Sequence, residues 1–239
     1  MKVYLACRMA PTAMREGLIW CAYQYRRYLR RLPCNGVFEM AEPIGPPVGT
    51  FDWGMSLPPR GQGGLVHVIV DTPKGSSNKY KYDPRLRLFK LSRVMPLGMH
   101  FPCDFGAIPS TAAADGDALD VAVITDHPSF IGCLLTVRLI GVLEAEQTEK
   151  GRTIRNDRLV AVPETPVNKP EMRQLRDLPR GSMAQLEQFF VGYNRAHGRQ
   201  FKPLGRGGRR YAEQLLRAAI QLHDQRRDGK RHDRGKTLR

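Results

Sequence analysis

The alternation of hydrophobic and polar residues predicts a β-rich domain that begins near Leu65. Short runs of β-branched and aromatic residues, bounded by glycine, proline and small polar residues, are typical of strands. We expect strands at residues 66–70, 79–82, 87–91, 121–125, 134–143 and 159–162. Residues 101–105 and 107–108 form a compact aromatic segment that Gly106 interrupts. After Pro170 the spacing becomes helical, and it predicts helices at residues 183–195 and 211–226. Many short strands followed by two helices indicate an α+β fold with a closed or strongly curved sheet.

The composition divides the chain into four parts. Residues 1–42 are a basic N-terminal extension, part of which has the apolar spacing of a helix, at residues 12–32. Residues 43–64 are rich in proline and glycine, which predicts an irregular linker. Residues 65–226 form the β-rich domain, and residues 227–239 form a basic C-terminal tail.

The formal net charge of the 239-residue chain is +15. Such an excess predicts attraction to polyanions, which include nucleic acid, anionic membranes and phosphorylated substrates. The first 31 residues carry seven lysine and arginine residues against a single acid, Glu16, and the C-terminal tail is again basic. Much of the charge therefore lies outside the β-rich domain, where the simplest interpretation is a pair of solvated basic arms.

Composition also indicates the compartment. No hydrophobic run approaches the length of a membrane-spanning helix, and the N-terminus lacks the pattern of a secretory signal. The five cysteines show no C-x-x-C spacing, which argues against a zinc site and a disulfide framework and fits a reducing compartment. We therefore expect a cytoplasmic protein without membrane association. The arginine-rich extension is weakly similar to an organelle transit peptide, so organelle targeting stays an alternative.

Three carboxylates fall within six residues, at Asp115, Asp117 and Asp120, with Gly116 between the first two. Carboxylates this close repel one another unless they share cations. Oxygen ligands suit hard cations such as Mg²⁺, which completes its coordination with water and substrate phosphate. The spacing therefore predicts a magnesium site. The alternatives for such a cluster are a solvated acidic turn and a calcium loop.

Six segments resemble, in order and spacing, those of one enzyme family. They are residues 73–80 (PKGSSNKY), 101–109 (FPCDFGAIP), 115–121 (DGDALDV), 141–143 (GVL), 158–163 (RLVAVP) and 189–193 (FFVGY). Together they resemble the family I soluble inorganic pyrophosphatases, over about residues 65–226. The resemblance implies a small five-stranded OB-like β-barrel with helices packed outside. It also implies Mg²⁺-dependent hydrolysis of pyrophosphate to two orthophosphates, in a homo-oligomer.

The resemblance assigns roles to the acidic residues. It implies that Asp115 and Asp120 ligate metal, and that Asp117 orients or deprotonates the attacking water and lies among the metal ligands. Asp71 stands where the family has a glutamate that binds a further metal. Because Asp is one methylene shorter, its contact with that metal can pass through water.

The resemblance also implies a phosphate-binding set. Lys79 and Arg93 match phosphate-binding positions, and Arg158 stands where the family has a lysine. Tyr193 matches a tyrosine that donates a hydrogen bond to phosphate, which places it with Asp117 among the catalytic residues. The alternative for the cationic residues is an ordinary surface charge, and the alternative for Tyr193 is an aromatic residue that packs on the barrel.

Several positions depart from the family pattern. Lys81 replaces a glutamate, Phe105 a phosphate-binding tyrosine and Asn194 a lysine. In a strand, residues 79 and 81 face the same side, so two ammonium groups should line one wall.

The second acidic loop, residues 144–157, has also changed. Gln147 stands near one of its aspartate positions, with Glu146 and Glu149 as alternatives for that role. Asn156 stands at the other position, with Asp157 shifted by one residue. We expect Asn156 and Asp157 to serve as metal ligands there. The site thus loses carboxylates and gains a cation, which predicts weaker Mg²⁺ binding and fewer bound ions.

Two functions from different classes follow from these residues. The first is a Mg²⁺-dependent inorganic diphosphatase with Asp117 as base. The alternative is a weakly active or non-catalytic relative that binds phosphate or polyphosphate, since the added positive charge also suits a longer anion. Nucleic-acid binding by the basic tails is a further option that we do not favour, because the acidic motif repels phosphate when no metal is bound.

Overall fold

A computed structural model describes residues 57–113, 116–164 and 172–236, with side chains described as far as Asp228. All of these residues belong to one compact unit, Phe51–Arg239. The helix predicted at residues 12–32 lies outside the described residues, as do Asp115, the whole of the predicted N-terminal arm and residues 237–239 of the C-terminal arm.

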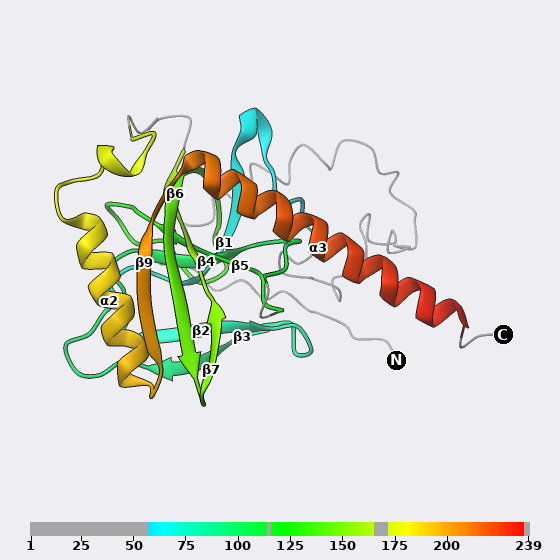
Figure 1. The fold of residues 1–239 in the computed structure, drawn as a ribbon, viewed down its shortest axis with the longest axis horizontal. Helices are drawn as coiled ribbons and strands as arrows, with labels where there is room; N and C mark the ends of the chain where they lie inside the picture. Colours follow the sequence, from blue (N-terminus) through cyan, green and yellow to red (C-terminus); the bar gives the residue numbers. More distant parts are fainter. Residues whose placement is uncertain (1–56, 114–115, 165–171, 237–239) are drawn as a thin grey trace, which may run out of the picture. The chain divides into compact units, whose positions relative to one another are not determined.

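Among the described residues, five strands close into a ring (Figure 1). In ring order they are β1 (Val66–Thr72), β4 (Asp104–Ile108), β5 (Leu119–Val123), β8 (Arg158–Pro163) and β6 (Leu134–Glu149). The β5–β8 pair is parallel and the other pairs are antiparallel, and pairing of β1 with β6 closes the ring. This ring confirms the predicted five-stranded OB-like barrel.

Alternate residues of the ring strands fill the barrel interior. The interior cluster includes Val66, Val121 and Leu159, which come from three different strands and are at most 1% exposed. Helix α3 (Arg209–Lys236) adds Leu216 and neighbouring alanines to the same cluster. Because side chains alternate between the two faces of a strand, the residues between these positions face outward.

A second apolar layer lies between the outer face of the barrel and helix α2 (Ser182–Ala196). Phe190 and Tyr193 of α2 pack there with Phe101 and Phe105. Phe105 and Phe190 have ring centroids 5.7 Å apart, a favourable separation for aromatic pairs. This aromatic layer holds α2 against the strands that carry the predicted site residues.

Gly106 does not interrupt the aromatic segment, so that prediction is wrong. Strand β4 passes through Gly106, which lies opposite Val70 of β1. A Cβ atom at this position would lie 2.2 Å from the carbonyl oxygen of Ile69. The glycine is therefore required by the close approach of two backbones and does not mark a turn.

Residues 144–157, predicted as a loop, form a hairpin instead. Strand β6 continues to Glu149 and turns into β7 (Arg152–Arg155), which pairs with it. The polar character of these residues hid the strands, because one face of the hairpin is exposed.

Strand β9 (Gln200–Gly208) was not predicted at all. Its three glycines and its basic residues lack the apolar alternation of a strand, yet it pairs along β6. Figure 1 shows β9 between α2 and α3, both of which contact it. Helix α3 is also longer than predicted, since it begins at Arg209 and ends at Lys236.

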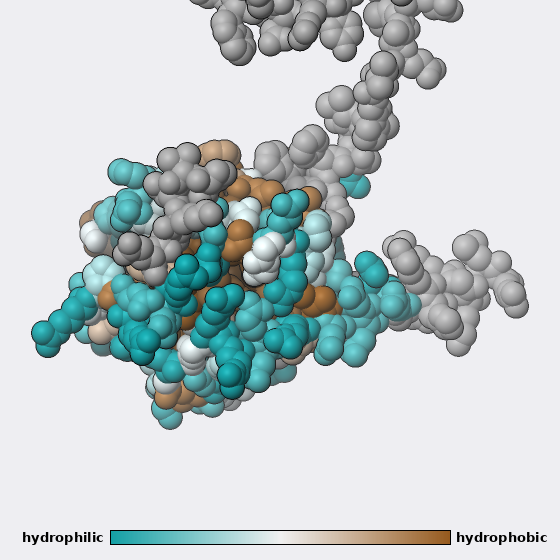
Figure 2. All heavy atoms as spheres, turned by 90° about the horizontal axis from the view of Figure 1, so that it is seen from above, coloured by the Kyte–Doolittle hydropathy of each residue, from teal (hydrophilic) through white to brown (hydrophobic). Residues whose placement is uncertain are grey.

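The remaining described elements are a separate two-stranded sheet and two short 3₁₀ helices. Strands β2 (Asn78–Asp83) and β3 (Leu88–Val94) form the two-stranded sheet, and the 3₁₀ helices are Gln62–Gly64 and Leu175–Asp177. The face seen in Figure 2 is mainly hydrophilic, with small separate hydrophobic areas. None of the helices in the described ranges is long and apolar enough to cross a membrane.

Candidate active site

A cavity of about 570 Å³ lies on the outer face of the barrel, and each strand from β1 to β8 and helix α2 contribute residues to its lining. Its charged lining residues among those described are Asp71, Asp117, Asp120, Glu149, Lys79, Lys81, Arg93, Arg158 and Arg199. Five cationic side chains against four carboxylates leave a positive excess, which favours an anionic ligand.

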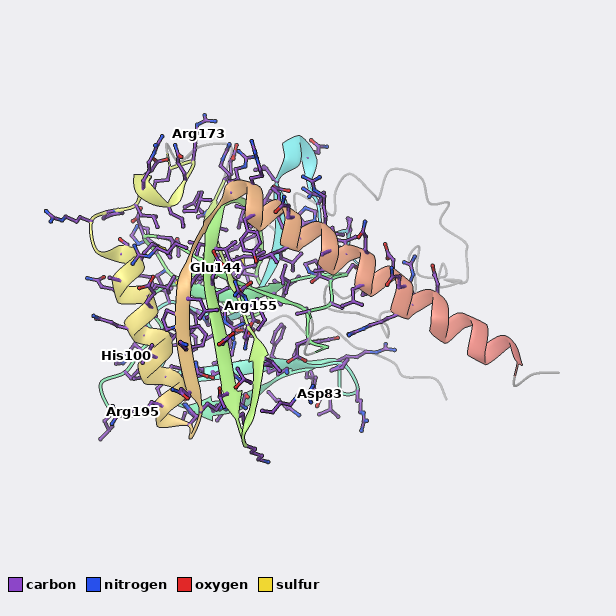
Figure 3. All side chains as sticks on the ribbon, viewed as in Figure 1. Asp83, His100, Glu144, Arg155, Arg173 and Arg195 are labelled. Carbon is purple, nitrogen blue, oxygen red and sulfur yellow. The ribbon has the colours of Figure 1, made fainter. Side chains whose placement is uncertain are left out.

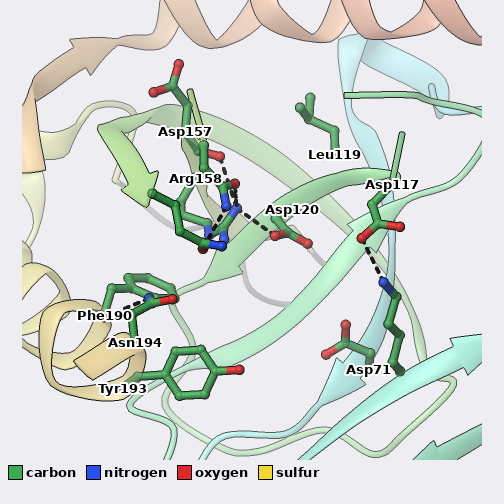
Figure 4. Close-up of polar contacts among 12 residues, drawn as sticks. Asp71, Asp117, Leu119, Asp120, Asp157, Arg158, Phe190, Tyr193 and Asn194 are labelled. Atoms are coloured by element: carbon green, nitrogen blue, oxygen red, sulfur yellow. Dashed lines mark hydrogen bonds and ion pairs between the residues drawn. The ribbon is translucent and has the colours of Figure 1, made fainter. Parts of the chain in front are cut away.

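The parallel pairing of β5 with β8 brings Asp120 and Arg158 together. Val121 is in register with Leu159, and both fill the barrel interior, so the preceding residues face outward side by side. Arg158 Nη1 lies 2.6 Å from Asp120 Oδ2 (Figure 4). Arg158 thus holds the third aspartate of the acidic motif in the cavity.

Two amide side chains extend this contact. Arg158 Nη1 donates a hydrogen bond to Asn156 Oδ1, and Asn156 Nδ2 donates to Gln147 Oε1 at 3.0 Å. These amides stand where the resemblance implied carboxylates. Their oxygens can ligate a cation, but they contribute no negative charge and already accept hydrogen bonds from the protein.

Asp71 and Lys79 form a largely buried ion pair. Lys79 Nζ lies 2.8 Å and 3.0 Å from the two carboxylate oxygens, and both side chains are 14% exposed. Burial raises the pKa of Asp71, while the Lys79 charge opposes that rise. Lys79 Nζ also lies 4.2 Å from the centroid of Phe105. Phe105, which stands where the family has a tyrosine, therefore stabilises the Lys79 ammonium group through the face of its ring.

Lys81 reaches across the cavity to the acidic motif. Its Nζ lies 2.7 Å from Asp117 Oδ2, and the two side chains are 53% and 60% exposed. Gly116 precedes Asp117 with a φ of 93°, a conformation that side chains disfavour, so the glycine shapes the turn that presents Asp117. Both Lys79 and Lys81 line the cavity, as the strand period predicted.

Arg93 and Tyr193 meet at the α2 side of the cavity. Arg93 lies opposite Lys79 in the β2–β3 hairpin, and Arg93 Nη1 donates a hydrogen bond to the Tyr193 hydroxyl at 3.1 Å. The Tyr193 ring stacks on Phe189, with 15° between the ring planes. The aromatic layer thus fixes the direction of the hydroxyl.

Some of the expected residues lie elsewhere. The structure does not bring Asp157 into the cavity, because its Oδ1 accepts hydrogen bonds from Arg155 Nε at 2.7 Å and from the Ala145 amide at 2.9 Å. Figure 4 shows the carboxylate of Asp157 pointing away from Asp120. Figure 3 shows Arg155 beside Glu144, whose Oε2 accepts from Arg155 Nη2 at 2.6 Å.

The residues at the end of α2 add no positive charge to the cavity, although the family has a lysine at the position of Asn194. Asn194 is 1% exposed, and its Nδ2 donates to the Phe190 carbonyl, as a helix-internal contact. Arg195 is exposed and points away from the barrel (Figure 3). Neither residue supplies a cation to the cavity.

Sequence reasoning missed Arg199. It lies just before β9, lines the cavity, and places Nη2 3.0 Å from Glu149 Oε1. Only a prediction of β9 and its pairing with β6 could have revealed this position, and the glycine-rich sequence of β9 gave no such signal.

The chemistry of the donor set fits a hard divalent cation. Asp71, Asp117, Asp120, Asn156 and Gln147 place only oxygen ligands around one cavity, with an ammonium or guanidinium beside each carboxylate. In the part of the chain that the structure describes, no three acidic, histidine or cysteine side chains already form a metal-binding cluster. Asp115 lies outside that part.

Comparisons with known proteins point in one direction. A family model described as inorganic pyrophosphatase matches residues 68–224. The chain is 34% identical over 149 residues to an inorganic pyrophosphatase from Synechocystis, which covers 62% of this chain and 86% of the relative. An inorganic pyrophosphatase from Thermus thermophilus is 34% identical over 159 residues, covering 65% and 89% of the two chains.

The comparison with solved structures points to the same family. The crystal structure of the Thermus thermophilus inorganic pyrophosphatase superposes with a TM-score of 0.66 at 34% identity, and the match covers 72% of this chain and 98% of that one. An inorganic pyrophosphatase from Neisseria gonorrhoeae gives a TM-score of 0.65 at 30% identity, with coverage of 72% and 99%. The barrel, its helices and the order of the site segments are therefore similar to those of these proteins.

Proposed function

Because the chain belongs to the inorganic pyrophosphatase family, we propose that it hydrolyses pyrophosphate to two orthophosphate ions. One observation supports this activity above the others. Three cationic phosphate-binding candidates, Lys79, Arg93 and Arg158, line the same cavity as Asp117 and Asp120, the two described aspartates of the acidic motif. A diphosphate carries several negative charges, so attack by water requires those charges to be offset.

The side chains divide the work between the two ends of the substrate. Lys79, Arg93 and Arg158 bind phosphate oxygens and stabilise the charge that develops on the leaving phosphate. Tyr193 is held toward the cavity by the aromatic layer and donates a hydrogen bond to a phosphate oxygen. Bound Mg²⁺ ions, held by Asp71, Asp115, Asp120 and Asn156, would neutralise the substrate and lower the pKa of the attacking water.

Asp117 acts as the base. It is the most exposed of the described aspartates in the cavity, so its carboxylate can reach water and accept a proton from it. Exposed ion pairs contribute about 0–1 kcal/mol, so a phosphate group can draw Lys81 away from Asp117 when substrate binds. The same step moves the Lys81 ammonium group away from the Asp117 carboxylate, which then accepts the proton.

A release assay for inorganic phosphate tests this proposal. We expect the full chain to release phosphate from pyrophosphate in Mg²⁺, and D117N to lose at least about a hundredfold, as general-base catalysis requires. D83N is the matched control. Asp83 also forms an ion pair with a lysine of the β2–β3 hairpin, Lys90, but it does not line the cavity. Unchanged turnover in D117N would remove the proposed base.

One set of observations favours a second function, the binding of phosphate or polyphosphate with little hydrolysis. Gln147 and Asn156 provide no negative charge, and each described aspartate of the cavity already has a cationic partner. Weak turnover of pyrophosphate together with tight binding of tripolyphosphate would support this alternative. Faster hydrolysis of pyrophosphate than of tripolyphosphate would contradict it.

A further inference from the structure

Lys81 differs from the other cationic residues of the cavity in its position on the hairpin and in the carboxylate that it contacts. It lies on β2, opposite Lys90 of β3, and its ammonium group contacts a carboxylate 36 positions later in the chain. Lys90 makes an equally short ion pair, 2.7 Å to Asp83, but stays on its own hairpin and outside the cavity. The hairpin thus carries two lysines of similar exposure, and only Lys81 faces the acidic motif.

The ion pairs of the cavity also differ in burial. The side chains of Asp71 and Lys79 are 14% exposed, and that of Arg158 is 10% exposed, whereas Lys81 and Asp117 are more than half exposed. An ion that arrives from solvent therefore meets the carboxylate of Asp117 beside an exposed ammonium group. Lys81 carries three N–H donors and no lone pair when charged, so it competes with a metal ion and cannot ligate it.

We propose that Lys81 is a tethered counter-cation that takes the place of one divalent ion beside Asp117. The inference rests on the proposed function, because it concerns the metal requirement of the same site. A divalent ion that binds at Asp117 has to displace the ammonium group or remain close to a like charge, and both lower its affinity. The chain thus offsets part of the Asp117 charge with its own residue, and it holds fewer divalent ions, or holds them more weakly, at this carboxylate.

Metal binding to the full chain without substrate tests this inference. Electron paramagnetic resonance of Mn²⁺ counts free and bound ions for the wild type, K81Q and K90Q. We expect K81Q to bind Mn²⁺ about tenfold more tightly, or to hold one additional ion, because a like charge is removed near the site. K90Q loses the same charge from the same hairpin and should match the wild type. Equal binding by all three proteins would overturn the inference.

A conservative variant separates charge from shape. K81R keeps the positive charge and should bind Mn²⁺ as the wild type does, while tighter binding by K81R would show that side-chain bulk, not charge, controls the site. Circular dichroism of each variant checks that the fold is retained.

The same variants distinguish this inference from the proposed function. In the phosphate-release assay, K81Q should reach half-maximal activity at a lower Mg²⁺ concentration than the wild type and K90Q. A failure of every variant to release phosphate would contradict the proposed function, whereas the Mn²⁺ titration would still decide the role of Lys81. Unchanged Mn²⁺ binding with active enzymes would contradict the role of Lys81 alone.

Discussion

Each described aspartate of the cavity lies within hydrogen-bonding distance of a lysine or arginine, and the pairs differ in what they can do. The Asp71–Lys79 pair is largely buried, so removal of either partner would leave an uncompensated charge. The exposed Asp117–Lys81 pair contributes little to stability and opens readily. The site therefore combines a fixed charge pair on the barrel wall with an adjustable pair at the acidic motif.

The hydroxyl of Tyr193 should matter for activity and little for folding. In Y193F the ring keeps its stacking on Phe189, but Arg93 loses the oxygen that accepts its hydrogen bond. A hydrogen bond to a charged group contributes about 1.5–3 kcal/mol, so we expect kcat/KM for pyrophosphate to fall at least about tenfold. Y211F, which removes a tyrosine hydroxyl outside the cavity, is the control. Equal losses in both variants would exclude a specific role for Tyr193.

The two described cysteines should differ in reactivity. Burial raises the pKa of the fully buried Cys103 thiol to about 12. Partial burial also raises the pKa of the Cys133 thiol, which is partly exposed. Iodoacetamide reacts with the thiolate, and a thiol with a raised pKa has little thiolate at about pH 8. We therefore expect iodoacetamide to label the buried Cys103 far more slowly than the partly exposed Cys133. Peptide mass spectrometry measures both rates. Equal labelling in the folded protein would contradict the buried position of Cys103, and unfolding in urea should remove the difference.

Resemblance to a family identified most of the charged residues that line the cavity, but not the partners with which they pair. Lys79, Arg93 and Tyr193 could be placed from sequence, since their segments keep order and spacing. The sequence could not decide whether Asn156 or Asp157 faces the cavity. That depends on how the connection between β7 and β8 is oriented. Asn156 and Arg158, two residues apart, face the cavity, and the residue between them faces Arg155.

At the scale of the elements, the contact between β1 and β4 positions one wall of the cavity. Asp71 lies on β1, and Phe105 and Ala107 lie on β4, so the separation of the two strands sets the width of that wall. Gly106 allows this separation, because any side chain there would meet the backbone of Ile69.

G106A should therefore destabilise the barrel. The added Cβ would lie 2.2 Å from the Ile69 carbonyl oxygen, so the strands must move apart. We expect a loss of about 3 kcal/mol or more in the free energy of unfolding, at the upper end of overpacking effects. Urea denaturation measures this loss. G208A is the control, because Gly208 is also in a strand and has open space where the Cβ would be. A loss in G208A as large as that in G106A would contradict a specific clash.

The elements that sequence analysis missed share a physical cause. Strands β7 and β9 attach to β6 outside the closed ring, and their exposed faces carry polar residues and glycine. Their pairing depends on long-range hydrogen bonds, which local hydrophobic patterns do not report. The ring strands, which fill the interior with alternate apolar residues, were recognised for the opposite reason.

At the scale of the whole molecule, the cavity uses a continuous part of the chain. Its described lining residues lie between Ile69 and Arg199, within the match to the family model at residues 68–224. The N-terminal 56 residues precede this region and contribute to the high positive charge of the chain. The catalytic domain and the basic extension can therefore have separate roles.

A variant that lacks residues 1–56 should keep its activity. Because the domain has its own interior cluster and its own cavity, we expect phosphate release from pyrophosphate within about twofold of the full chain, as for a domain that folds by itself. The assay compares both proteins at the same Mg²⁺ concentration, and the thermal unfolding midpoint reports whether the shorter chain is folded. Loss of turnover with an unchanged midpoint would show that the extension acts on the site directly. If the shorter chain also loses a salt-sensitive affinity for RNA, the extension carries that affinity, since binding through phosphate contacts weakens as salt is raised.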